Sequence, residues 1–103
     1  MIALVAALLA QAAAPSPAQD VWDKRCIFCH GADGRSQTKK GKQYKAPNFT
    51  RAKWQQHTTD DEIVDAITNG VPKTKMPSFK EKLSPEEIKA MVPFLRDFWK
   101  NKK

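Results

Sequence analysis

Two cysteines and a histidine within five residues constrain this chain more than any other feature. Two residues separate Cys26 from Cys29, and His30 follows directly. On a helix, thiols at this spacing lie about one turn apart, within reach of neighbouring edges of a flat macrocycle whose metal the histidine can bind. C-x-x-C-H is the attachment motif of a c-type haem. The sequence therefore predicts one covalent haem c, with Cys26 and Cys29 forming thioethers and His30 as an axial iron ligand.

Other uses of the two cysteines explain less of the pattern. A thioredoxin-type C-x-x-C belongs to an alternating strand–helix sequence, which this chain does not show. A zinc site needs four ligands, and His57 lies far outside the usual spacing for a histidine paired with His30. A structural disulfide would leave His30 without a role. We therefore rank these three interpretations below haem attachment.

The N-terminal segment favours export. Residues 1–14 carry no charged side chain and are rich in Leu and Ala, and small residues between Ala12 and Ala18 offer cleavage sites. This is typical of a signal peptide, although no Lys or Arg precedes the run, so a retained anchor or an upstream start stays open. The run is short for a membrane span. We expect a signal peptide over 1–14, one domain over 15–103, and a periplasmic or otherwise exported protein without stable membrane insertion.

The charge balance bears on partners. Eighteen basic residues against 11 acidic ones give a net charge of +7. Such a balance suits nucleic acid, an anionic membrane or an acidic protein. Because we expect export, we predict redox protein partners with acidic docking surfaces, no nucleic acid, and a monomer. A chain of this size buries little apolar surface, and a covalent haem would add a large apolar body to its core.

Capping signals and apolar periodicity predict three main helices and no strands. Capping boxes begin at Thr59 and Ser84, and Gly70 is a C-terminal stop. Ser16 and Pro17 suit the start of the first helix. Pro93 falls within the last apolar stripe and should bend that helix without ending it. The predicted helices cover residues 16–30, 59–70 and the segment from 84 onward, separated by irregular stretches over 31–57 and 71–83.

Three segments of the chain resemble the class I cytochromes c, especially the small exported bacterial and algal electron carriers. They are the haem motif, Ala46-Pro47-Asn48-Phe49, which is similar to the family's Gly-Pro-Asn-Leu, and Met76-Pro77-Ser78-Phe79, which is similar to its Met-Pro-x-Phe. The resemblance covers nearly all of the chain after the leader. It implies an all-α cytochrome c fold, with three main helices and long loops wrapped around one covalent haem.

The resemblance also implies particular contacts. The Pro47 carbonyl is expected to accept a hydrogen bond from the His30 imidazole. Trp22 on the first helix is expected to pack across Met91 and Phe94 on the last.

Met76 is the candidate for the second axial ligand. It lies in a polar loop where core packing explains a methionine poorly, and His/Met ligation is a known haem arrangement. His57, in a polar stretch, is the rival, and we predict that it is a surface residue. Tyr44 and Trp54 either donate to the haem propionates or fill space, and this choice stays open. The less certain haem-pocket residues are Tyr44, Pro47, Phe49, Trp54 and Phe79.

Lysines crowd both irregular stretches. We interpret one group as a docking ring near the redox centre, because steering of a partner needs charge there. The other group receives no assigned role. The first group is Lys73, Lys75, Lys80 and Lys82, and the second is Lys39, Lys40, Lys42 and Lys45.

These features predict a soluble periplasmic one-electron carrier that is not an enzyme. One alternative is a haem enzyme or ligand sensor of the peroxidase type, which needs an exchangeable sixth ligand that Met76 would deny it. Rapid cyanide or CO binding would favour this alternative. The other is a haem subunit of a larger redox complex, which co-purification with an oxidase or dehydrogenase would reveal.

Overall fold

All regular structure in the described part of the chain is helical. The computed structural model describes residues 17–101, and the predicted leader over 1–14 and the cap Ser16 lie outside that range. Within 17–101 the elements are helices alone, which confirms the predicted all-α class. No helix in this range is both long and apolar enough to cross a membrane.

The first predicted helix is present but contains a wider turn. It consists of α2 (Pro17–Val21), the π-helical turn η1 (Trp22–Cys26) and α3 (Ile27–His30). In η1 the amide of Ile27 donates to the carbonyl of Trp22, five residues earlier, which inserts one residue into the turn. Gly31 ends α3 at φ +79°, a conformation that disfavours a side chain. The extra residue changes the helical phase between Trp22, which is buried, and the haem motif.

The two later helices begin where their caps predict. The helix α6 (Asp60–Asn69) follows the N-cap Thr59, and α7 (Pro85–Lys100) follows the N-cap Ser84. Both capping boxes form in full. The helix α7 continues past Pro93, as expected, and the predicted bend at that residue stays a prediction.

The stretch 31–57 is not irregular throughout, and here the sequence-based expectation was wrong. It contains two short helices, α4 (Lys39–Tyr44) and α5 (Ala52–His57). The Thr38 hydroxyl caps α4 by accepting a hydrogen bond from the amide of Gly41 at 2.9 Å. Neither helix has an apolar stripe in the sequence, and α5 has no side-chain cap. Their stability therefore depends on tertiary contacts, which periodicity does not report.

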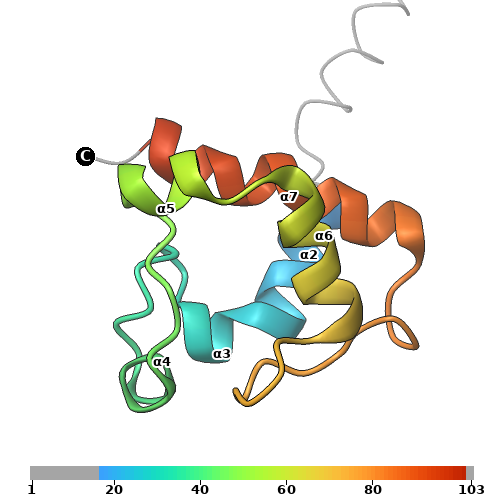
Figure 1. Ribbon diagram of the computed structural model, residues 1–103, viewed down its shortest axis with the longest axis horizontal. Coiled ribbons are helices and arrows are strands. Elements are labelled where there is room, and N and C mark those ends of the chain that lie inside the picture. The colour runs from blue at the N-terminus through green and yellow to red at the C-terminus, as the bar shows by residue number, and fades with distance from the viewer. Residues whose placement is uncertain (1–16, 102–103) are drawn as a thin grey trace, which may run out of the picture.

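The longest helix, α7, organises the core. It lies along one side of the molecule with α2, α5 and α6 packed against it, while α3 packs against α4 (Figure 1). Trp22 and Met91 are the largest fully buried side chains of this core. The Trp22 ring lies 5.4 Å from that of Phe94, which confirms a contact that the family resemblance implied, and 4.9 Å from that of Phe98. The buried apolar residues are Ala18, Val21, Trp22, Phe49, Ile63, Phe79, Leu83, Ile88, Met91 and Leu95.

Candidate haem site

A cavity of about 330 Å³ opens between the first helix, α6 and the two long connecting segments. Its walls are largely apolar, and its size lies within the range of roughly 300–1,000 Å³ usual for ligand and cofactor sites. The structure brings every sequence-predicted site residue to this cavity. The lining includes Cys26, Cys29, His30, Tyr44, Pro47, Phe49, Trp54, Met76 and Phe79.

The two cysteines mark one edge of the cavity. Cys26 ends η1 and Cys29 lies on α3, and both are half-buried free thiols. Burial raises the pKa of Cys26 to about 11, because the surrounding apolar groups do not solvate a thiolate. Both cysteines line the cavity that holds the other predicted site residues.

His30 lies beside the cysteines with its ring held between aromatic groups. The ring stacks on Phe49 with a centroid distance of 4.7 Å and lies 5.8 Å from the ring of Trp22. Burial lowers the pKa of His30 to about 4, and a contact with the Pro47 carbonyl partly opposes that change. The imidazole is therefore neutral at physiological pH, which is the form that binds a metal.

A serine that the sequence analysis did not single out joins this side of the site. The Ser36 hydroxyl donates to the Pro47 carbonyl at 2.5 Å, and its oxygen lies 3.4 Å from His30 Nδ1. The expected Pro47 acceptor is thus in place beside His30, but it is shared with Ser36. Nothing in the local sequence pattern marks Ser36, because its neighbours at the site are 11 and six positions away.

Met76 lines the cavity from the loop that joins α6 to α7. It is half-buried, and its carbonyl accepts a hydrogen bond from the amide of Val71 at 3.2 Å. The loop rejoins α6 where the amide of Phe79 donates to Ile67 at 2.9 Å and the Ser78 hydroxyl donates to Thr68 at 2.6 Å. These hydrogen bonds orient the loop so that Met76 reaches the cavity from an element other than the one that carries His30.

The cavity is lined by the remaining predicted aromatic residues but not by the rival histidine, His57. Tyr44 and Trp54 are half-buried and line the cavity, and the Trp54 ring lies 4.6 Å from that of Phe49. The Tyr44 ring also lies under the Lys40 ammonium at 5.4 Å. His57 is exposed at the end of α5 and is not among the lining residues, in agreement with its prediction as a surface residue.

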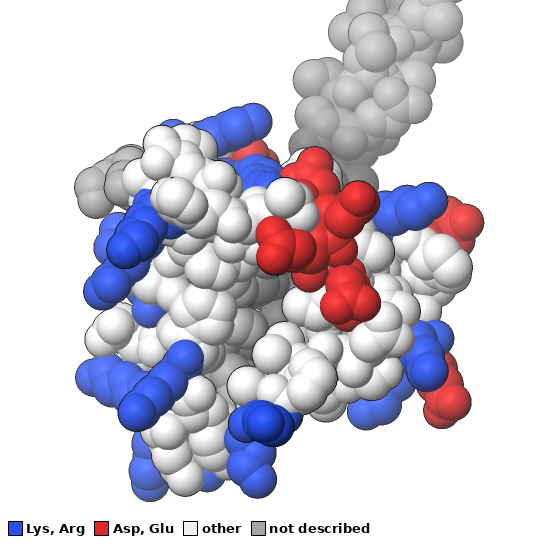
Figure 2. All heavy atoms as spheres, viewed as in Figure 1, with Lys and Arg blue, Asp and Glu red and all other residues white. Residues whose placement is uncertain are grey.

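Charges of both signs meet at the cavity. Arg25, Lys45 and Lys75 line it together with Glu62. Figure 2 shows the acidic first turn of α6, which consists of Asp60, Asp61 and Glu62, gathered beside the hollow, with basic side chains spread around the rest of this face. The cavity therefore lies between an acidic turn and a basic surround, and not within a uniform basic ring.

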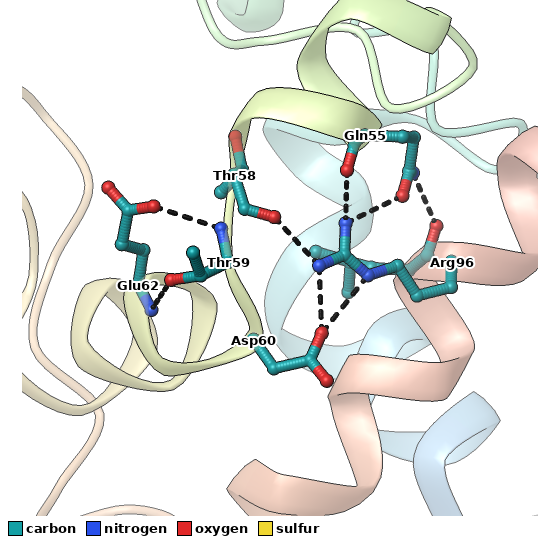
Figure 3. Close-up of polar contacts among 7 residues, drawn as sticks. Gln55, Thr58, Thr59, Asp60, Glu62 and Arg96 are labelled. Atoms are coloured by element: carbon teal, nitrogen blue, oxygen red, sulfur yellow. Dashed lines mark hydrogen bonds and ion pairs between the residues drawn. The ribbon is translucent and has the colours of Figure 1, made fainter.

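A network centred on Arg96 supports the wall that α5 and α6 form. Its guanidinium on α7 donates to the Gln55 carbonyl at 2.9 Å, to the Thr58 carbonyl at 2.7 Å and to Asp60 at 2.7 Å (Figure 3). The buried side-chain amide of Gln55 in turn donates to the carbonyls of Phe49 at 2.7 Å and Leu95 at 3.0 Å. One arginine thus ties the end of α5 and the start of α6 to α7.

The donor set and the walls of the cavity fit a haem. Two thiols lie at one edge, a neutral imidazole and a thioether reach the same space from separate elements, and the rest is mainly apolar. Cysteine thioethers, with His and Met as axial ligands, are the protein groups of a low-spin c-type haem.

Comparison with known proteins agrees with this geometry. The family described as "Cytochrome C oxidase, cbb3-type, subunit III" matches residues 13–95, which is well over half of the chain. The chain belongs to this family of c-type cytochromes. This cytochrome is also similar in structure to the KustC0563 c-type cytochrome, at 42% sequence identity and a TM-score of 0.73, over 79% of this chain and 95% of that one. A point mutant of Kustc0563 matches at 41% identity, with the same TM-score, over 81% and 99% of the two chains.

The curated relatives are much longer proteins. Over 75 residues the cytochrome is 29% identical to the cbb3-type cytochrome c oxidase subunit FixP of Bradyrhizobium sp. (strain ORS 278), covering 73% of this chain and 24% of FixP. The corresponding subunit of Bradyrhizobium diazoefficiens is 27% identical over 77 residues, covering 75% and 25%. This cytochrome therefore spans about a quarter of the length of the FixP subunits that it matches.

Proposed function

We propose that this cytochrome is a soluble, exported one-electron carrier with one covalent haem c. The observation that carries the proposal is that both thiols and both candidate axial ligands line one apolar cavity. A c-type cytochrome domain implies haem c, and Cys26 and Cys29 are the two cysteines available to attach it. When bound, haem iron alternates between the ferrous and ferric states and so stores one electron.

The surrounding residues favour transfer of electrons over turnover of a substrate. His30 supplies a neutral imidazole, and Met76 supplies a thioether that would occupy the second axial position. Thioether ligation raises the potential, and an apolar wall disfavours the more highly charged ferric state. Because His30 and Met76 would fill both axial positions of a bound haem, an external ligand would have to displace Met76, and we infer that the protein is not an enzyme.

The partner is a redox protein with an acidic docking surface, which a cytochrome of net charge +7 meets in the periplasm as a monomer. Lys45 and Lys75 reach the cavity from the two lysine-rich segments and are best placed to steer the approach. Rim charges of this kind act mainly on the association rate and lose strength as salt rises.

The similarity to FixP supports a second candidate, a haem subunit or domain of a larger redox complex. In that arrangement the same cavity would pass electrons within an assembly. The matched region covers only a quarter of FixP, so it supports shared haem chemistry more strongly than shared assembly.

Stopped-flow oxidation of the reduced protein by membranes of its host, with and without selective oxidase inhibitors, tests the proposal. A carrier should be oxidised in a second-order reaction whose rate rises with membrane concentration and falls with salt. Its resting form should bind CO or cyanide slowly. Rapid CO binding would support the enzyme or sensor alternative. Co-purification in fixed ratio with an oxidase or dehydrogenase would support the subunit alternative.

A further inference from the structure

Ser36 occupies an unusual backbone position next to the haem motif. It is 4% exposed, and its φ of +58° lies in the left-handed region, which is unfavourable for a residue with a side chain. Its amide donates to the His30 carbonyl at 3.0 Å. Two residues on, the Thr38 hydroxyl donates to the Cys29 carbonyl at 2.9 Å. The surrounding hydrogen bonds therefore hold Ser36 against α3 in a conformation it would otherwise avoid.

The contacts of the Ser36 hydroxyl determine where its proton lies. A carbonyl oxygen cannot donate, so in the 2.5 Å contact the hydroxyl donates to Pro47. Its single proton is then committed, and its oxygen can only accept from His30 Nδ1, which lies 3.4 Å away. That distance is long for a hydrogen bond. The imidazole N–H thus faces two oxygens, one of which is already bonded and the other distant.

We propose that Ser36 is a positioning residue that weakens the hydrogen bond made by the axial ligand His30. A hydrogen bond from the far nitrogen of a ligating imidazole raises the basicity of the nitrogen that binds the metal. By occupying the Pro47 carbonyl, the Ser36 hydroxyl makes that carbonyl a poorer acceptor for the Nδ1 proton. His30 becomes a weaker electron donor, which favours ferrous iron and a higher midpoint potential. The proposal rests on the proposed role of His30 as an iron ligand.

Two variants without the hydroxyl test the proposal in the haem-loaded protein. Ser36→Gly removes the conformational strain of the positive φ at this position, because glycine adopts it readily. Ser36→Ala retains that strain, because alanine still has a Cβ. Both should lower the midpoint potential by a similar amount, and both should move the Nδ1 proton of His30 downfield in the NMR spectrum of the reduced protein.

Thr50→Val is the matched control. Thr50 is also buried, at 5% exposure, but its hydroxyl donates to Asn48 at 2.7 Å and not to Pro47 or His30. This variant should leave the potential and the Nδ1 proton unchanged.

Three results would overturn the role of Ser36. They are an unchanged or raised potential in Ser36→Gly, a change confined to Ser36→Ala, and an equal change in Thr50→Val. Failure of the proposed function itself looks different. In that case the unmodified protein would lack a low-spin, histidine-bound haem spectrum, and both proposals would fall together.

Discussion

The two sides of the cavity are held in different ways. The histidine side, over residues 26–49, is anchored by hydrogen bonds to the haem motif itself, including those to the carbonyls of Cys29 and His30. The Trp22 indole adds a buried bond to the Gly31 carbonyl at 3.0 Å. On the methionine side, over residues 70–83, most side chains are exposed and the bonds near Met76 lie within the loop or reach the end of α6.

This difference indicates that the histidine side is rigid and preorganised, whereas the methionine side opens more easily. The histidine side presents its candidate ligand, His30, in an aromatic and hydrogen-bonded setting. The methionine side carries its candidate ligand, Met76, on a loop, and loops with few buried contacts are where local opening is least costly. We therefore expect loss of the cofactor to affect both sides, loss of Met76 to affect one, and charge changes at the rim to affect neither fold nor ligation.

We expect the largest effect from loss of the haem, which would contact both sides of the cavity. Replacing Cys26 and Cys29 by alanine should abolish covalent haem and most of the helical signal in circular dichroism, because the remaining core is small for a stable domain. The contrast between the two sides of the cavity predicts that any residual helical structure lies in the histidine side and in α7. A haem-free chain that melts cooperatively with native helicity would contradict this prediction.

The second effect should separate the two sides. Met76→Ala should retain covalent haem and most helicity, but lose the weak near-infrared band of ferric iron–methionine bonding and bind cyanide readily. A tenfold loss of preference for the ferrous state corresponds to about 60 mV in a one-electron couple, and we expect a fall of at least that size.

The matched control for Met76 is the exposed His57. His57→Ala should leave the spectrum, the potential and cyanide binding unchanged. If His57→Ala lost an axial ligand while Met76→Ala kept both, the assignment of the methionine side would be reversed.

The third effect tests whether α5 and α6 depend on α7. Arg96→Met should leave the Gln55 and Thr58 carbonyls without their charged donor, and a lost partner of this kind costs about 2 kcal/mol. Thermal unfolding should then begin about 10 °C lower. Arg96→Lys keeps the charge without the planar fork and should fall between the parent and Arg96→Met. An unchanged melting temperature in both variants would show that packing alone holds this wall.

The smallest effect on structure concerns the rim. Reversing Lys45 and Lys75 to glutamate should slow electron transfer to the physiological acceptor roughly tenfold at low salt, because steering charges raise association rates by about this factor or more. The rate difference should shrink at physiological salt, and the potential should change little. Reversing Lys89 and Lys100 on α7, which do not line the cavity, alters net charge equally and should do less. If both pairs slowed electron transfer equally, the effect would come from net charge and not from the position of the lysines at the rim.

Much of the site was predictable because its signals are local. The haem motif, the Thr59 and Ser84 capping boxes and the glycine stop at Gly70 each depend on residues within one or two turns. The π-helical turn at Trp22 was not predictable in this way, because it inserts one residue into an otherwise helical segment and no local residue pattern marks that insertion. The helices α4 and α5 were missed for the related reason that tertiary packing, and not periodicity, stabilises them.

Local sequence patterns were enough to indicate the class of cofactor, the all-α fold and the candidate site residues, since covalent spacing and helix caps act over a few positions. Tertiary structure alone decided which groups meet at the site. Ser36 reaches Pro47 and His30, Arg96 joins α7 to the end of α5 and the start of α6, and Lys45 comes to the same cavity as Lys75. These neighbours are distant in sequence, and closing the chain around a core is what brings them together. A pattern of adjacent residues therefore predicts the ligands, whereas the environment that tunes them depends on the fold.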